Sequence, residues 1–182
     1  MTRFRIDPGR SRVWIEARSS LHPIHSETDG LEGWFEVDLL GGGRINPTVD
    51  PKLHLELPVE MLSSGNGLYD REMRRRVDAR RYPTIAGDVT TMKETDEDGR
   101  YQVTGDVRFR GETTSCTDEM RLSAPEEGVV QLEGSHSFDI RDFGMQPPRI
   151  LTLRVHPDVS VRVSIVARAE ALAGGPPTSP RS

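Results

Sequence analysis

Three of the five histidines in this chain could act together as metal ligands. His22 and His25 lie three residues apart, and neutral imidazoles at that spacing can bind one metal ion. Two ligands are too few for a metal site, so a third must come from elsewhere in the chain. His136 is the candidate, because it shares its strand parity with Gly134 and Phe138 on an apolar face. The sequence therefore predicts a Zn²⁺ or Fe²⁺ site formed by His22, His25 and His136. The alternative is a hydrogen-bonded His136 in the core and a solvated pair.

Charged residues in the segment 62–83 offer further groups for such a site. Asp70 or Glu72 could add a carboxylate to the three imidazoles. The planar guanidinium of Arg71 matches a carboxylate or phosphate, so Arg71 is a candidate for holding the polar end of a ligand. Surface ion pairing is the competing interpretation. The sequence has no Gly-rich phosphate loop, no G-x-S-x-G motif and no CxxC pair. This lack of a complete catalytic set favours a non-enzyme and leaves catalysis open.

Most of the chain alternates between apolar and polar residues, which is typical of half-buried β-strands. The segment 19–30 breaks the alternation and is predicted to be a loop. The alternating segments are 12–17, 34–39, 53–59, 85–92, 101–109, 116–122, 130–140 and 151–165, the last with a kink at 157–158. About eight strands joined by short turns predict an all-β fold, either an antiparallel barrel or a sandwich. An eight-stranded barrel can fill its interior or hold one small ligand.

The segment 62–83 is the one stretch with helical periodicity. Tyr69, Met73 and Val77 are spaced four apart, which places them on one face of a helix. Asn66 is a suitable N-cap, because its short polar side chain can accept hydrogen bonds from the free backbone donors of the first turn. Pro83 ends the segment. A single short helix among strands is predicted to cover or gate one end of a barrel.

Composition and charge exclude several classes of protein. The length of 182 residues fits one domain, predicted for residues 1–170, and the Gly- and Pro-rich residues 171–182 are predicted to be a disordered tail. The net charge is −5, so the chain lacks the excess of basic residues that is typical of nucleic-acid-binding proteins. One cysteine cannot form an internal disulfide, and no apolar leader or membrane-spanning stretch is present, which predicts a cytoplasmic protein. A homodimer is left open.

Four motifs resemble the YceI-like, polyisoprenoid-binding family. They are FRIDPGRSRVWIEA at 4–17, SSGNGLYDREMRRRVDARRYPTI at 63–85, YQVTGDVRFRG at 101–111 and FDIRDFGM at 138–145. Each motif alone is weak, but all four occur in the order found in the family and span roughly residues 4 to 168. The resemblance implies a lipocalin-like antiparallel β-barrel with a helix beside it. It also implies a long apolar pocket for an isoprenoid or a similar amphiphile.

The parity of the strands predicts which side chains face that pocket. Small residues at Ala17, Gly87, Gly105, Cys116 and Gly134 on the inward parity favour an empty lumen over a filled core. The predicted ligand-binding residues are Val13, Ile15, Phe35, Val37, Leu55, Val103, Val107, Phe109, Leu132, Phe138 and Val161, with Arg71 at the mouth. The leading hypothesis is carriage or storage of an isoprenoid or fatty-acid-like molecule, with no cofactor assigned with certainty. The alternatives are a metal-binding protein or metal-dependent enzyme that uses the three histidines, and a filled barrel whose partner is another protein.

Overall fold

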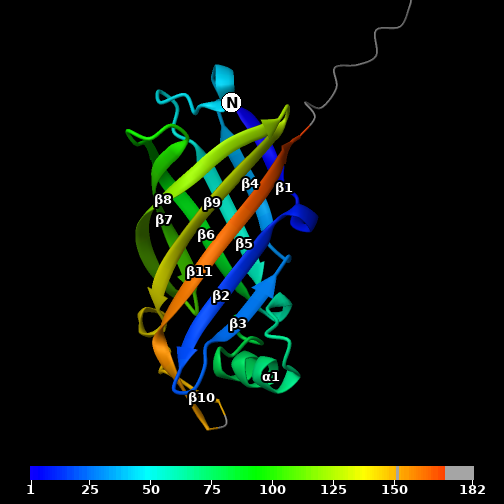
Figure 1. The fold of residues 1–182 in the computed structure, drawn as a ribbon, viewed down its shortest axis with the longest axis vertical. Helices are drawn as coiled ribbons and strands as arrows, with labels where there is room; N and C mark the ends of the chain where they lie inside the picture. The colour runs from blue at the N-terminus through cyan, green and yellow to red at the C-terminus, as the bar shows by residue number, and fades with distance from the viewer. Residues whose placement is uncertain (151, 171–182) are drawn as a thin grey trace, which may run out of the picture.

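Eight antiparallel strands close into a barrel, as the sequence predicts (Figure 1). The structure, a computed structural model, describes residues 1–150 and 152–170, so the predicted tail at 171–182 lies outside the described residues. The strands of the ring, in spatial order, are β1 (Thr2–Ile6), β4 (Glu32–Val37), β5 (Lys52–Pro58), β6 (Thr84–Glu94), β7 (Arg100–Phe109), β8 (Glu112–Glu126), β9 (Val129–Asp139) and β11 (Leu153–Ala169). Pairing of β1 with β11 closes the ring, which rules out the sandwich.

Two further strands extend the barrel wall beside β11. The long strand β11 pairs with β1 near its C-terminal end and with β2 (Arg12–Ser19) along its earlier part. The predicted kink at 157–158 does not break β11; it appears as a shift in register between Val155 and Val159. A two-residue strand, β10 (Arg149–Ile150), pairs with the beginning of β11.

The strand β3 (Ile24–Thr28) corrects the prediction of a loop at 19–30. It pairs with β2 along its whole length, and its side chains alternate, with Ile24 and Ser26 lining the barrel interior. Its outer edge is bridged to the segment before the helix by two backbone hydrogen bonds between Glu27 and Ser63. With only one large apolar residue in five, β3 carries too weak an apolar alternation to be recognised from the sequence.

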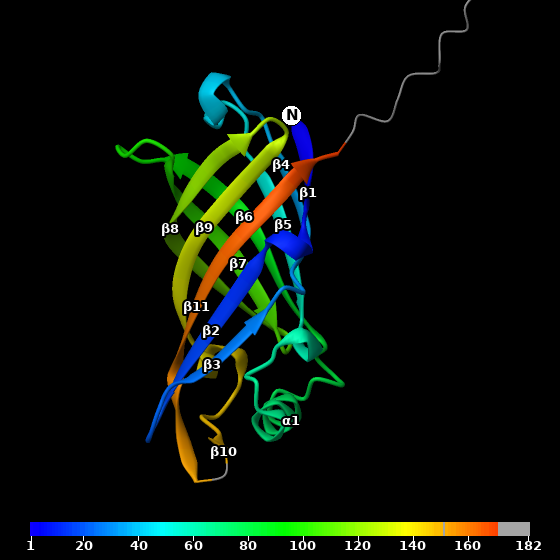
Figure 2. The same cartoon turned by 45° about the vertical axis from the view of Figure 1, so that its right-hand side comes forward.

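The helix α1 (Gly67–Arg76) is shorter than the predicted segment 62–83 and lies across one end of the barrel (Figures 1 and 2). Asn66 caps it as predicted, because its side chain accepts hydrogen bonds from the backbone N–H groups of Leu68 and Tyr69 at 3.0 and 3.3 Å. Just past its end Asp78 adopts a left-handed backbone with φ of 54°, which stops the helix before Pro83. No helix within the described residues is both long and apolar enough to cross a membrane.

The interior of the barrel is packed at the end opposite α1, here called the filled end. The rings of Phe4 and Phe35 pack there in a tilted arrangement at 6.4 Å between centroids, and both residues are buried. The hydroxyl of Tyr101, a residue only 2% exposed, accepts a hydrogen bond from the backbone of Ile45 at 3.1 Å. The end of the barrel beside α1 is here called the helix end. A second, smaller cluster packs there and consists of Val59, Val77, Phe109 and Phe143. The wall between these two clusters therefore encloses the space in which a ligand could lie.

Candidate functional site

A cavity of about 410 Å³ occupies the barrel between the filled end and α1. This volume lies within the range of roughly 300–1,000 Å³ that is usual for small-molecule sites. Eight of the predicted ligand-binding residues line it: Val13, Ile15, Leu55, Val103, Val107, Phe109, Phe138 and Val161. All five predicted small inward residues line it too. At Gly87 the wall leaves space that a larger side chain would fill, whereas a β-carbon at Gly105 or Gly134 would meet Asp88 or Met120 at 2.6 or 2.9 Å.

The helix contributes one wall of this cavity. Tyr69, Met73 and Val77, the predicted apolar face of α1 and its C-cap, all line the cavity. The guanidinium of Arg110 on the barrel holds this end of the helix by donating a hydrogen bond to the carbonyl of Val77 at 2.8 Å. The helix therefore lies where it can close the cavity, and hydrogen bonds from Arg74 to the carbonyls of Glu60 and Leu62 also hold it there.

Four predicted ligand-binding residues do not line the cavity. Phe35, Val37 and Leu132 point inward as parity requires, but they are 0%, 0% and 1% exposed and belong to the packed core. Parity reports which side of a strand a residue faces, and it carries no information about height along the barrel axis. Arg71 lies exposed on the surface of α1, away from the cavity. Its contact with a ligand head group stays a prediction.

The three histidines predicted to bind metal do not converge. The pairing of β2 with β3 sets His25 opposite Glu16 on the outer face, with His25 Nδ1 at 3.1 Å from a Glu16 carboxylate oxygen. His22 is exposed, and its Nδ1 lies 3.1 Å from the carbonyl oxygen of Pro23. Only His136 lies in the cavity wall. The prediction of a joint His22, His25 and His136 site is therefore corrected by the hydrogen bonding of β3, which turns His25 outward.

The two carboxylates considered as additional ligands are also engaged elsewhere. Glu72 accepts hydrogen bonds at 2.8 Å from Arg75 and Arg76 on the surface of α1. Asp70 binds the segment that precedes the helix. Neither carboxylate joins a group of possible metal ligands among the described residues.

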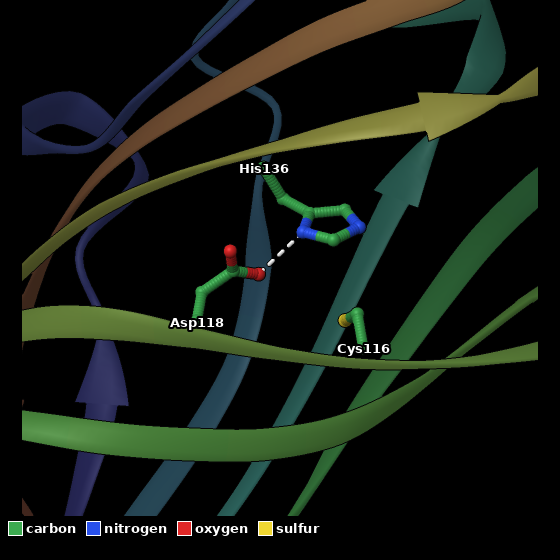
Figure 3. Close-up of side chains that lie close together, drawn as sticks. All are labelled: Cys116, Asp118 and His136. Atoms are coloured by element: carbon green, nitrogen blue, oxygen red, sulfur yellow. Dashed lines mark ion pairs between the residues drawn. The ribbon is translucent and has the colours of Figure 1, made fainter.

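A polar cluster of Cys116, Asp118 and His136 lies in the otherwise apolar cavity wall (Figure 3). Cys116 and Asp118 are two residues apart on the inward side of β8, and His136 reaches toward them from the neighbouring strand β9. His136 Nδ1 lies 2.5 Å from Asp118 Oδ2. The ring of Phe138 packs edge-on against the imidazole at 4.4 Å between centroids. The imidazole of His136 thus lies between the carboxylate of Asp118 and the ring of Phe138.

The thiol of Cys116 is held in its protonated form. Burial raises its pKa, and the nearby charges of Asp118 and Asp106 raise it further, since each opposes a second negative charge. Asp118 is a site residue that the sequence itself indicates. It lies midway between Cys116 and Met120, both assigned to the apolar parity, so a charged residue there must face the interior.

Asp70 is a buried carboxylate at the rim of the cavity, with an exposed fraction of 8%. It accepts hydrogen bonds from the backbone N–H and hydroxyl of Ser64 at 2.8 and 2.6 Å and from the hydroxyl of Ser63 at 3.1 Å. Burial alone would raise its pKa, but these hydrogen bonds and the charge of Arg74 outweigh burial and hold the pKa below its ordinary value. Asp70 therefore fixes the start of α1 to Ser63 and Ser64, in the segment that precedes the helix.

We expect Asp70→Asn to lower the free energy of unfolding by about 1–3 kcal/mol at neutral pH, since it weakens a buried, fully hydrogen-bonded carboxylate. A lowered pKa stabilises the fold above the pKa of the unfolded chain, and this contribution is lost as the pH falls through the folded-state pKa. The difference between wild type and variant should therefore shrink on acidification. Urea unfolding at neutral and acidic pH measures it, with exposed Asp96→Asn as the control. A difference that is constant with pH would contradict this role.

The comparisons with known proteins agree with this fold. A domain model described as YceI-like matches residues 4–167. No curated protein matches the chain. A polyisoprenoid-binding domain from Saccharophagus degradans, implicated in plant cell wall breakdown, shares 12% identity over 93% of this chain and 100% of that chain, with a TM-score of 0.75.

Two further solved structures have the same architecture. BcnA from Burkholderia cenocepacia shares 15% identity over 88% of this chain and 98% of that chain, with a TM-score of 0.73. A YCEI protein from Campylobacter jejuni shares 11% identity over 82% of this chain and 86% of that chain, with a TM-score of 0.63. At these identities the three structures establish a common fold.

Proposed function

The chain belongs to the YceI-like family, and on this premise we propose that it binds a hydrophobic or amphiphilic small molecule in its barrel, for carriage or storage. The observation that carries the proposal is the barrel cavity of about 410 Å³, whose wall is built mainly from aliphatic and aromatic side chains. Transfer of an apolar ligand from water into such a cavity is favourable. Each methylene group moved from water into it contributes about 0.8 kcal/mol.

We propose an isoprenoid chain or a fatty-acid-like chain as the ligand. A structural neighbour with 12% identity is a polyisoprenoid-binding domain, which supports the choice of a prenyl chain. The wall contains few polar groups that could select a compact polar molecule, and most of its side chains offer only dispersion contacts. In this proposal affinity depends on chain length and on the fit of the chain to the cavity, with little selectivity for the head group.

The helix α1 would act as the movable wall in this proposal. Its apolar residues face the cavity, and the rim beside it contains Ser64 and Asp70, the polar groups closest to the start of the helix. A chain that enters at the helix end would place its apolar tail toward the packed filled end. The polar head group would then remain near the rim, where water can reach it.

A series of prenols and straight-chain alcohols of increasing length tests this proposal. We expect affinity to rise about fourfold for each added methylene, the equivalent of about 0.8 kcal/mol, until the cavity is filled. Longer chains should then gain nothing. Titration by displacement of a fluorescent apolar probe from delipidated protein measures the series, and native mass spectrometry identifies any lipid that copurifies. Affinity that does not change with chain length, or an absence of binding, would refute the proposal.

A further inference from the structure

The cluster of Cys116, Asp118 and His136 is not explained by the binding of an apolar chain. Polar groups in an apolar wall lower its affinity for hydrocarbon and cost free energy to bury. The side chains of Asp118 and His136 are 31% and 29% exposed, so they lie at the cavity surface and are within reach of a small solute in the lumen. A cluster of this composition in such a place needs a function of its own.

The geometry of the cluster suits a small cation. One ligand atom from each residue, a sulfur, a carboxylate oxygen and an imidazole nitrogen, lies within 4.8 Å of the other two. Tetrahedral coordination with bonds of 2.0–2.3 Å separates ligand atoms by about 3.3–3.7 Å. The carboxylate and imidazole, now 2.5 Å apart, would open by about 1 Å to admit the ion, and the thiol would move closer. Small side-chain rotations on two adjacent strands are enough for both movements.

We propose that Cys116, Asp118 and His136 bind one Zn²⁺ ion in the barrel wall, with the fourth coordination position open toward the lumen. The mixed sulfur, nitrogen and oxygen set is the kind of ligand set that Zn²⁺ accepts, and three protein ligands with one open position are typical of accessible zinc sites. The proposal does not rest on the binding of an apolar ligand.

The balance of charge supports a dication over a monocation. A thiolate and a carboxylate carry two negative charges, a neutral imidazole carries none, and Zn²⁺ brings the sum to zero. A neutral complex costs least to hold in an apolar wall. On binding, the thiol releases its proton to solvent. The imidazole coordinates through Nδ1 as the neutral ring, with its remaining hydrogen on Nε2.

A thiol beside a histidine–carboxylate pair can also serve as a nucleophile, and the structure disfavours that use. An active cysteine needs a lowered pKa, whereas burial, Asp118 and Asp106 all raise the pKa of Cys116. The same surroundings favour a cation, because a dication offsets the thiolate and the Asp118 carboxylate that bind it, and the nearby negative charge of Asp106 attracts it.

Equilibrium dialysis of untagged, metal-free protein against Zn²⁺ tests the site, with the bound metal measured by elemental analysis. We expect one Zn²⁺ per chain. Cys116→Ser, Asp118→Asn and His136→Gln should each weaken binding by more than about tenfold, since even residues one step removed from a metal contribute that much. Two outward-facing controls, His25→Ala and Glu119→Gln, should leave it unchanged. Thermal unfolding of each variant checks that it is folded.

Cobalt substitution of the wild-type protein provides a readout that needs no variant. Co²⁺ in the site should show a thiolate-to-cobalt charge-transfer absorption and the intense visible bands of tetrahedral coordination. Absence of the charge-transfer band would overturn the assignment of Cys116, and equal Zn²⁺ binding by wild type and His136→Gln would overturn the site. Loss of Zn²⁺ binding in His25→Ala alone would move the metal to the outer face and would also overturn it.

Discussion

Gly87→Phe should abolish most ligand binding while the protein remains folded. Gly87 lies on β6 with its neighbours Leu55 and Val107 across the sheet, and all three line the cavity. A β-carbon built at Gly87 meets its nearest atoms at 3.9 and 4.0 Å, so the new side chain has room to enter the lumen without a clash. If the benzyl group displaces about four methylenes of a bound chain, affinity falls by a hundredfold or more, at about 0.8 kcal/mol each.

The matched control for this substitution is Gly41→Phe. A β-carbon at Gly41 meets nothing within 4 Å, and the residue lies in the connection between β4 and β5, at the other end of the barrel from α1 (Figure 1). Displacement of a fluorescent apolar probe measures both variants, and circular dichroism confirms that both are folded. A folded Gly87→Phe protein that binds as tightly as wild type would place the ligand outside the cavity.

Phe35→Ala should destabilise the fold far more than Phe138→Ala, although both remove the same side chain from the barrel interior. Phe35 is fully buried in the filled end, so its loss leaves a cavity and should cost about 3–5 kcal/mol. Phe138 already borders open space in the lumen, and its removal loses fewer contacts, at an expected cost of about 1–2 kcal/mol.

For ligand affinity the order of the two variants should be reversed, with the larger loss in Phe138→Ala. Phe138→Ala removes a contact surface from the cavity wall and should weaken binding, whereas Phe35→Ala should leave the affinity of the folded protein unchanged. Chemical unfolding and probe titration on the same two variants measure both quantities. Equal losses of stability would mean that the barrel is packed uniformly, and this would contradict the division into a filled end and a hollow middle.

Strand parity explains why much of this structure follows from the sequence. Alternation along segments such as 101–109 placed Val103, Val107 and Phe109 on the inside, and the structure has all three in the cavity wall. The Asn66 cap likewise follows from local chemistry, since it involves only backbone groups two and three residues away. Both features depend only on residues that are close together in the sequence.

The errors concern features that depend on distant parts of the chain. The height of Phe35 along the barrel axis is set by its partners Phe4 and Leu53 on two other strands, which parity cannot supply. The outward orientation of His25 depends on the pairing of β3 with β2, and β3 has too little apolar alternation to be recognised. Asp118 is different, because its inward parity between Cys116 and Met120 follows from the sequence alone.

Intermolecular nuclear Overhauser effects between bound farnesol and the methyl groups of the protein test the central claim most directly. If the prenyl chain lies inside the barrel, its protons should contact the methyl groups of Leu55, Val107 and Val161, which line the cavity. Contacts confined to Leu21 and Leu68, which are 74% and 48% exposed, would place the ligand on the outer surface and contradict the account.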